Sequence, residues 1–254
     1  MIFINSLHSE WLKTKRSFAF WLTIIGGFFI PLIYFISFLY NGSSINSSPA
    51  GMNGWSMHFM QCWQNMTAFL LPMGVIMASS LITQMEFRNN TWKQLHTTPQ
   101  SFTTIFFAKL SVIMLLTLQF FIFFNIGILL SGILPCIFFD GNLSNDSIPV
   151  FDFLKSNIKF FIGCMPIIAL QYLISLRFKN FLIPILIGLF SLIGSLIALQ
   201  WDYIFLSPFS FCILNVMPGR EFPVMLNVQW MALISFSVIT LINFYLYINR
   251  KEKG

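Results

Sequence analysis

The stretch TIFFAKLSVIMLLTLQFFIFFNIGILL, residues 104–130, decides the fold class, because Lys109 is its only charged residue. The hydrocarbon core of a bilayer is about 30 Å thick and an α-helix rises about 1.5 Å per residue, so about 20 apolar residues are enough to cross it. The stretch exceeds this length. It therefore predicts a transmembrane helix.

The rest of the chain has the same character. Of its 254 residues, 57% are hydrophobic and only 9% are charged, whereas a soluble domain carries about 25% charged residues. Six long runs contain no acidic residue, at about 18–40, 66–84, 104–130, 157–176, 181–200 and 229–249. They lack the apolar–polar alternation over about ten residues that marks a transmembrane β-strand. The sequence predicts an all-α polytopic membrane protein in which six transmembrane helices form a single domain, residues 1–254.

The positions of lysine and arginine predict how the chain is oriented. Basic residues gather before the first run, between the second and third runs, in the turn RFKN at 177–180, and after the last run. The intervening connections hold few of them. By the positive-inside rule, both termini and the segment 85–103 lie in the cytoplasm. The net charge of +6 therefore reflects topology, so membrane lipids are expected partners and nucleic acid is not.

The six runs contain no Asp, Glu or His. Such residues form the proton relays of many ion-coupled carriers, so their absence from the runs argues against a self-sufficient secondary transporter. Lys109 and Lys159 lie near run ends, and we expect their ammonium groups to reach the headgroups. The chain has no G-x-x-x-x-G-K-[ST] motif and no catalytic or metal-ligand pattern, so it is not expected to be an enzyme or to hold a metal or nucleotide itself.

Residues 1–17 predict an amphipathic helix. Phe3, Leu7 and Trp11 recur at helical spacing, and basic residues such as Lys13 lie elsewhere on the helical wheel. This pattern fits a helix that lies in the inner membrane interface, with its basic residues near anionic headgroups. A simple flank that anchors the first span, or part of a surface that docks a partner, are the alternatives.

The polar segment FRNNTWKQLHTTPQS, residues 87–101, separates the second and third runs. Thr91 and Leu95 fall on one helical face, and Trp92 adjoins it. Pro99 ends the helix, because the residue before a proline is forced out of the α region. The segment predicts a short cytoplasmic helix across the inner surface, with a plain basic loop as the alternative.

This region resembles the ABC-2 type permeases. In that family an acidic residue ends span two, a Thr-x-x-x-Leu-like helix follows, a proline breaks the chain, and a lysine begins the next span. The residues that match this order are Glu86, Thr91, Leu95, Pro99 and Lys109. The pattern TWKQL is especially similar to lantibiotic-immunity and bacitracin-type permeases, which have a similar length and six spans.

The resemblance implies a type V exporter-like transmembrane domain with three special segments. Residues 1–17 would be an interface helix, residues 86–100 a coupling helix, and residues 201–227 an outer segment that is a candidate for re-entry into the membrane. Both cytoplasmic helices would contact a separate ABC ATPase subunit, which would bind the ATP and Mg. The implied coupling residues are Glu86, Arg88, Thr91, Trp92, Lys93, Leu95 and Pro99.

Polar residues inside the spans are candidates for a substrate path between two copies of the protein. They are Gln119, Asn125, Gln171 and Asn243. Alternatively, such residues bond across packed helices for about 0.6 kcal/mol each.

Small residues in the fifth run are candidates for a dimer seam, because the family implies dimer contact there. They are Ser191, Gly194, Ser195 and Ala198, and small residues at this spacing let helices approach closely. Ordinary packing within one subunit is the alternative.

The function implied by the resemblance is that of a permease subunit of an ATP-driven exporter in the bacterial cytoplasmic membrane. Two copies, or one copy and a related permease, would expel an amphiphilic peptide antibiotic for self-protection. Export of a lipid-linked glycan or another hydrophobic compound is the first alternative. A non-transporting membrane scaffold or sensor subunit is the second.

Overall fold

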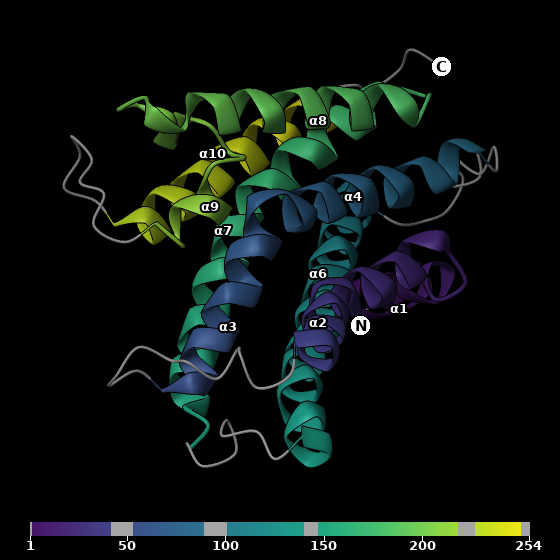
Figure 1. The fold of residues 1–254 in the computed structure, drawn as a ribbon. Coiled ribbons are helices and arrows are strands. Elements are labelled where there is room, and N and C mark those ends of the chain that lie inside the picture. Colours follow the sequence, from purple (N-terminus) through teal and green to yellow (C-terminus); the bar gives the residue numbers. More distant parts are fainter. Residues whose placement is uncertain (1, 42–52, 89–100, 140–146, 218–226, 250–254) are drawn as a thin grey trace.

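The computed structural model describes residues 2–41, 53–88, 101–139, 147–217 and 227–249. The regular elements within these ranges are all helices (Figure 1). Six helices are long and apolar enough to cross a membrane: Phe18–Tyr40, Gly54–Met85, Phe102–Pro135, Val150–Arg177, Leu182–Gln200 and Val228–Ile248. The prediction of an all-α membrane protein with six spans is confirmed.

The helices follow the chain in a simple order. The α-helices are α1 (Ile2–Thr14), α2 (Phe18–Asn41), α3 (Gly54–Asn65), α4 (Leu71–Arg88), α6 (Phe102–Phe139), α7 (Val150–Arg177), α8 (Leu182–Ile197), α9 (Phe211–Leu214) and α10 (Val228–Ile248). A π-helical turn, Met66–Leu70, joins α3 to α4, and the 3₁₀ turns Ala198–Gln200 and Ile204–Leu206 follow α8.

The second span starts earlier than the sequence predicts. The apolar run begins at about residue 66, but the helix begins at Gly54, where the Asn53 side chain accepts a hydrogen bond of 2.9 Å from the backbone N–H of Trp55. Residues 54–65 contain enough polar residues to look like a connection. Their buried positions nevertheless recur at helical spacing, and they are Trp55, His58, Phe59, Cys62 and Trp63.

The π-helical turn bends this span. The Leu71 N–H donates to the carbonyl of Met66, five residues back, and Pro72 has no N–H to donate. Thr67 Oγ1 donates to the Trp63 carbonyl at 2.8 Å, so a side chain of the π-turn also bonds to the end of α3. Sharp bends are typical of π-turns and prolines. As a result, α3 and α4 run in different directions (Figure 1).

The core forms around α6, which α2 follows in parallel. The two backbones approach closely at Gly27, where a side-chain carbon would come within 3.1 Å of Phe123 and 3.2 Å of the Phe124 nitrogen. On another side of α6, the Trp63 ring is fully buried and stacks on Phe160 at 4.1 Å between ring centroids. These contacts join α2, α3, α6 and α7.

Several helices end close together at one end of the bundle. The Tyr172 hydroxyl of α7 donates to the Phe106 carbonyl of α6 at 3.3 Å, and the Phe106 ring lies 5.4 Å from the Tyr247 ring of α10. Gln84, near the end of α4, donates to the carbonyl of Phe178. The connections predicted to share the cytoplasmic side therefore leave the bundle at one end, which we call the inner end. The orientation itself stays a prediction.

The chain after α8 packs back onto the middle of α7. Cys212 in α9 is fully buried, with its sulfur 3.4 Å from the sulfur of Cys164, and both thiols are free. Asn215 Nδ2 donates to the Lys159 carbonyl at 3.0 Å. Residues 209–216 are thus packed into the core, whereas Trp201, Tyr203 and Leu206 are exposed. Residues 218–226 of the predicted outer segment lie outside the described residues.

Candidate functional site

Two of the residues that the sequence assigns to energy coupling lie at the inner end of the bundle. Glu86 and Arg88 lie in the last turn of α4. The remaining five coupling residues lie outside the described residues, and they are Thr91, Trp92, Lys93, Leu95 and Pro99. The described residues resume at Ser101, just before α6. Its Oγ accepts a hydrogen bond of 3.3 Å from the Thr104 N–H, so Ser101 acts as the N-cap of α6.

Helix α1 docks on this end with a face that the amphipathic pattern does not indicate. Leu7 and Trp11 are partly buried and pack against the protein core, whereas Phe3 is 40% exposed. The most buried residues of α1 are polar, and they are Ser6, Glu10 and Thr14. The three predicted interface residues therefore do not all face the membrane together, because Leu7 and Trp11 contact the bundle and Phe3 does not.

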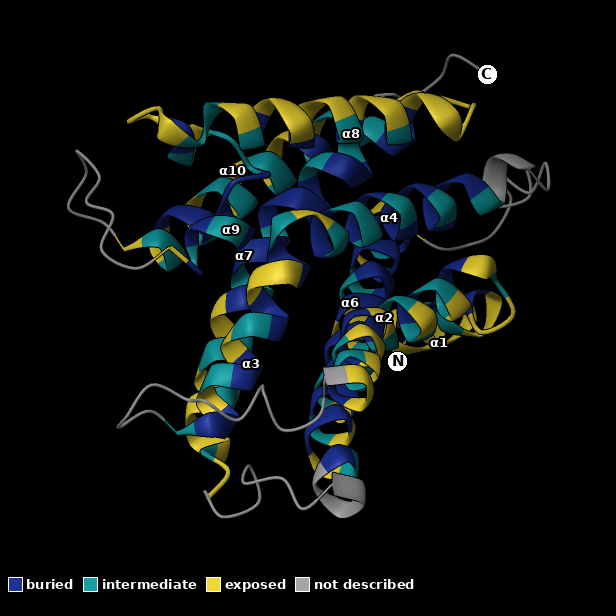
Figure 2. Ribbon diagram, in the orientation of Figure 1, coloured by how far each residue is buried: buried dark blue, intermediate teal, exposed yellow. Residues whose placement is uncertain are grey.

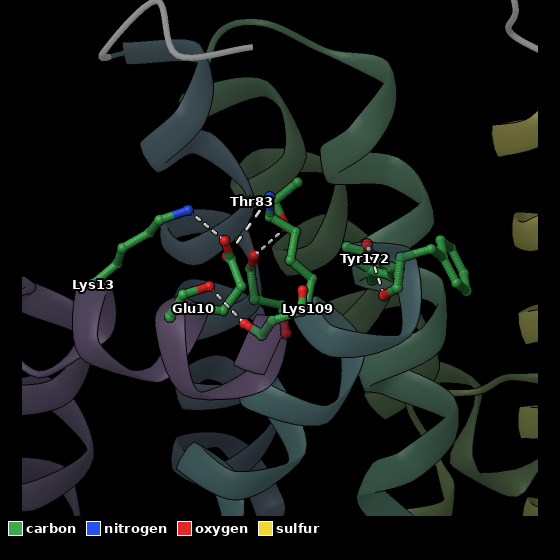
Figure 3. A network of polar contacts seen from close by, with 9 residues as sticks. Glu10, Lys13, Thr83, Lys109 and Tyr172 are labelled. Atoms are coloured by element: carbon green, nitrogen blue, oxygen red, sulfur yellow. Dashed lines mark hydrogen bonds and ion pairs between the residues drawn. The ribbon is translucent and has the colours of Figure 1, made fainter. Parts of the chain in front are cut away.

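A buried ion pair holds α1 to α6 (Figure 3). Lys109 Nζ lies 3.8 Å from Glu10 Oε2, and the Lys109 side chain is only 3% exposed. The other carboxylate oxygen of Glu10 accepts a hydrogen bond from Lys13 Nζ. The expectation that Lys109 reaches the headgroups is wrong, because the ammonium group points into the bundle, where Glu10 supplies the counter-charge. The sequence places these residues far apart and gives no signal of their contact.

Three of the four candidates for a substrate path bond to other helices of the same subunit. Gln119 donates to Thr23 Oγ1 of α2 at 3.1 Å. Asn125 and Asn157 exchange two hydrogen bonds of 2.8 and 3.0 Å between α6 and α7.

The other two path candidates lie on α7 and α10. Gln171 donates to Ser80 Oγ of α4 and to the Pro184 carbonyl of α8, both at 2.8 Å. Asn243 is 3% exposed, and its Nδ2 has no hydrogen-bond acceptor among the described residues. These contacts join different pairs of helices, which agrees with the alternative that such residues bond across packed helices.

The four seam candidates divide between two environments. Ser191 and Gly194 are exposed. The exposed side of α8 faces away from the other helices (Figure 2). Ser195 is buried and donates to the Leu192 carbonyl at 2.7 Å, and Ala198 packs against a small buried cluster that includes Phe211. Only the first two therefore lie on the outward side of the subunit.

His58 is a polar residue of the core that sequence reasoning missed, because it was assigned to a connection. It lies in the span Gly54–Met85, so the expectation that the spans contain no histidine is wrong. Its Nε2 is 3.0 Å from Ser131 Oγ, and that hydroxyl donates to the Ile128 carbonyl. Nε2 is therefore the donor in this contact, and His58 joins α3 to α6. Its helical spacing with Trp55 and Cys62 was the available signal.

The described part of the chain contains no group of three or more His, Cys, Asp or Glu residues that could hold a metal ion. The described polar side chains at the inner end form ion pairs and hydrogen bonds that connect helices. This arrangement can transmit movement between helices.

Comparison with known proteins agrees with this architecture. A family model described as ABC-2 family transporter protein matches residues 6–195, which is well over half of the chain. The match begins within α1 and ends within α8, and it includes the segment between α4 and α6. No curated protein and no solved structure matches the chain.

Proposed function

Because the chain belongs to the ABC-2 transporter family and is a membrane transport subunit, we propose that it is the permease of an ATP-driven exporter in the bacterial cytoplasmic membrane, with both termini in the cytoplasm. Two copies, or one copy and a related permease, would pair with two ABC ATPase subunits that bind ATP and Mg. The family match carries this proposal, because it spans α1 and the segment that follows α4.

The arrangement of the inner end supports a coupling role for residues 86–100. Helix α4 ends at Arg88 and α6 begins at Phe102, next to the place where α1 docks. In the proposal, Trp92 and Leu95 fill a hydrophobic groove of the ATPase, and charged residues such as Lys93 pair at its rim. A few aromatic and charged anchors usually carry such interfaces.

Replacing Leu95 by aspartate is expected to abolish co-purification of the ATPase. Replacing Trp92 by alanine is expected to weaken ATPase binding about thirtyfold, since a central anchor contributes about 2 kcal/mol. The measurement is the amount of ATPase recovered per permease, together with the ATP turnover of the complex. Trp21→Ala is the matched control, because Trp21 lies on α2 and is 57% exposed. Unchanged recovery and turnover in both variants would show that the docking assignment is wrong.

We propose an amphiphilic peptide antibiotic as the substrate, because the pattern TWKQL resembles lantibiotic-immunity permeases. A cell that lacks this chain should then be more sensitive to such a peptide. The measurement is the inhibitory concentration of the peptide with and without the chain, with the Leu95→Asp variant as a control that is still present in the membrane. Unchanged sensitivity, with ATPase binding intact, would turn the proposal to export of a lipid-linked glycan or another hydrophobic compound.

We propose that the outward side of α8 contributes to the seam between two permeases, with Ser191 and Gly194 at its centre. Gly194 supports this role, because a side-chain carbon there would meet nothing within 4 Å in the subunit. That position is therefore free to accept a neighbouring helix.

A further inference from the structure

The orientation of α1 on the bundle is not the one that hydrophobicity alone would choose. The helix buries Ser6, Glu10 and Thr14, which recur every four residues and therefore form one face. It leaves Ile4 67% exposed and Leu12 50% exposed. Leu7 and Trp11, beside this face, pack against the core, so apolar contacts help to hold α1 on the bundle. They do not explain why polar side chains occupy its most buried positions, which points to a specific interaction that sets the rotation of α1 about its own axis.

The Glu10–Lys109 pair has the properties that such an interaction needs. Lys109 is only 3% exposed on its side chain, and its apolar neighbours on α6 include Phe106 and Ile113, which are fully buried. A charge in such a place is strongly unfavourable unless an opposite charge lies beside it. Any rotation of α1 that carries Glu10 away would leave Lys109 buried without that counter-charge.

Lys13 further restricts the position of the Glu10 carboxylate. It donates to one carboxylate oxygen of Glu10, while Lys109 lies beside the other oxygen. The carboxylate is thus held from two sides, by α1 itself and by α6 (Figure 3). Polar and ionic contacts of this kind are best known for fixing the register of packed helices.

We propose that Lys109 is a positioning residue whose ion pair with Glu10 fixes the rotation of α1 on the inner end of the bundle. When α1 is fixed in this way, its side with Ile4, His8 and Leu12 faces away from the helix bundle. In the proposed function the interface helix acts on the ATPase, so the ion pair decides which side of α1 the ATPase can reach. This last step rests on the proposed function, whereas the rotation does not.

The test compares the reactivity of two single cysteines toward a maleimide in the purified full-length chain. Ser6→Cys lies on the buried side of α1 and His8→Cys on the exposed side. The chain without an added cysteine is the blank. Since a buried site reacts only when the helix opens locally, we expect Cys at position 8 to react roughly tenfold faster or more than Cys at position 6.

Two further backgrounds decide whether the ion pair causes this difference. In the double variant Glu10→Ala with Lys109→Ala, both charges of the pair are removed together and no large apolar side chain takes their place, so the bundle should still fold without the ion pair. We expect the ratio of the two rates to fall toward one. Inverting all three charges, with Glu10→Lys, Lys13→Glu and Lys109→Glu, should restore the ratio.

A ratio that stays the same in the double alanine variant would overturn the proposal, because the remaining contacts would then suffice to orient α1. Failure of the charge inversion to restore the ratio would also count against it. The assay uses no ATPase and no substrate. A failure of the proposed function would instead appear as an ATPase that still binds the Leu95→Asp variant, while the labelling ratio remains as expected.

Discussion

Replacing Trp63 by alanine is expected to destabilise the helix bundle by about 3 kcal/mol, the lower end of the range of about 3–5 kcal/mol for deleting a core aromatic side chain. The Trp63 ring is fully buried and contacts three other rings closely: Phe160 at 4.1 Å, Phe124 at 4.8 Å and Phe121 at 5.0 Å between centroids. These rings belong to α6 and α7, so the cavity would open where α3 meets both helices. We choose the lower end because lipid is itself apolar, so that lost packing is the main cost.

The measurement is the apparent melting temperature of the purified chain in detergent. Trp21→Ala is the matched control, because the same ring is removed from a side chain that is 57% exposed. Trp63→Phe should cost much less than Trp63→Ala, since it keeps a ring and removes an indole N–H that has no acceptor among the described residues. Equal melting temperatures for the two alanine variants would contradict the central role of Trp63.

Hydrophobic runs were enough to predict the helical class and the number of spans. The run at 104–130 lies wholly inside α6, and the run at 18–40 matches α2 almost residue for residue. This part of the prediction succeeded because a bilayer requires long apolar helices whatever their neighbours are. The same criterion failed for residues 54–65, whose polar residues conceal a helix with one buried face.

The positions of the charged residues were visible in the sequence, but their partners were not. Lys109 looked like a lysine near a span end, and Glu10 looked like one residue of a surface helix. Only the tertiary fold brings them to within 3.8 Å of each other. The same reason explains why the pattern of Phe3, Leu7 and Trp11 did not reveal which face of α1 packs on the bundle.

The polar residues within the spans were also visible in the sequence, whereas their partners were not. Their identity is evident from the sequence, yet their role depends on what lies opposite. Asn125 meets another asparagine, Asn157, and the two amides satisfy each other. Gln171 bonds to two other helices at once. A substrate path would require such groups to face one common opening, whereas these bonds hold the helices of one subunit together.

Gly163 provides the second large effect, because it allows residues 201–217 to pack against α7. A side-chain carbon at this position would come within 2.7 Å of Asn215 Nδ2 and 3.1 Å of the Phe211 carbonyl oxygen. The carbonyl belongs to the backbone of α9, so it cannot move aside by a change of rotamer. Asn215 also bonds to the Lys159 carbonyl and accepts a hydrogen bond from Gln229 of α10. Displacing it would loosen both contacts.

Replacing Gly163 by valine is therefore expected to destabilise the bundle by about 3 kcal/mol, at the upper end of the usual cost of overpacking. It should also expose Cys212, which is fully buried beside Cys164, so that maleimide labels this thiol much faster. Gly74→Val is the matched control, since a side-chain carbon at Gly74 on α4 would meet nothing within 4 Å. If Gly163→Val left the labelling of Cys212 as slow as in the control, residues 201–217 would not depend on this close approach to α7.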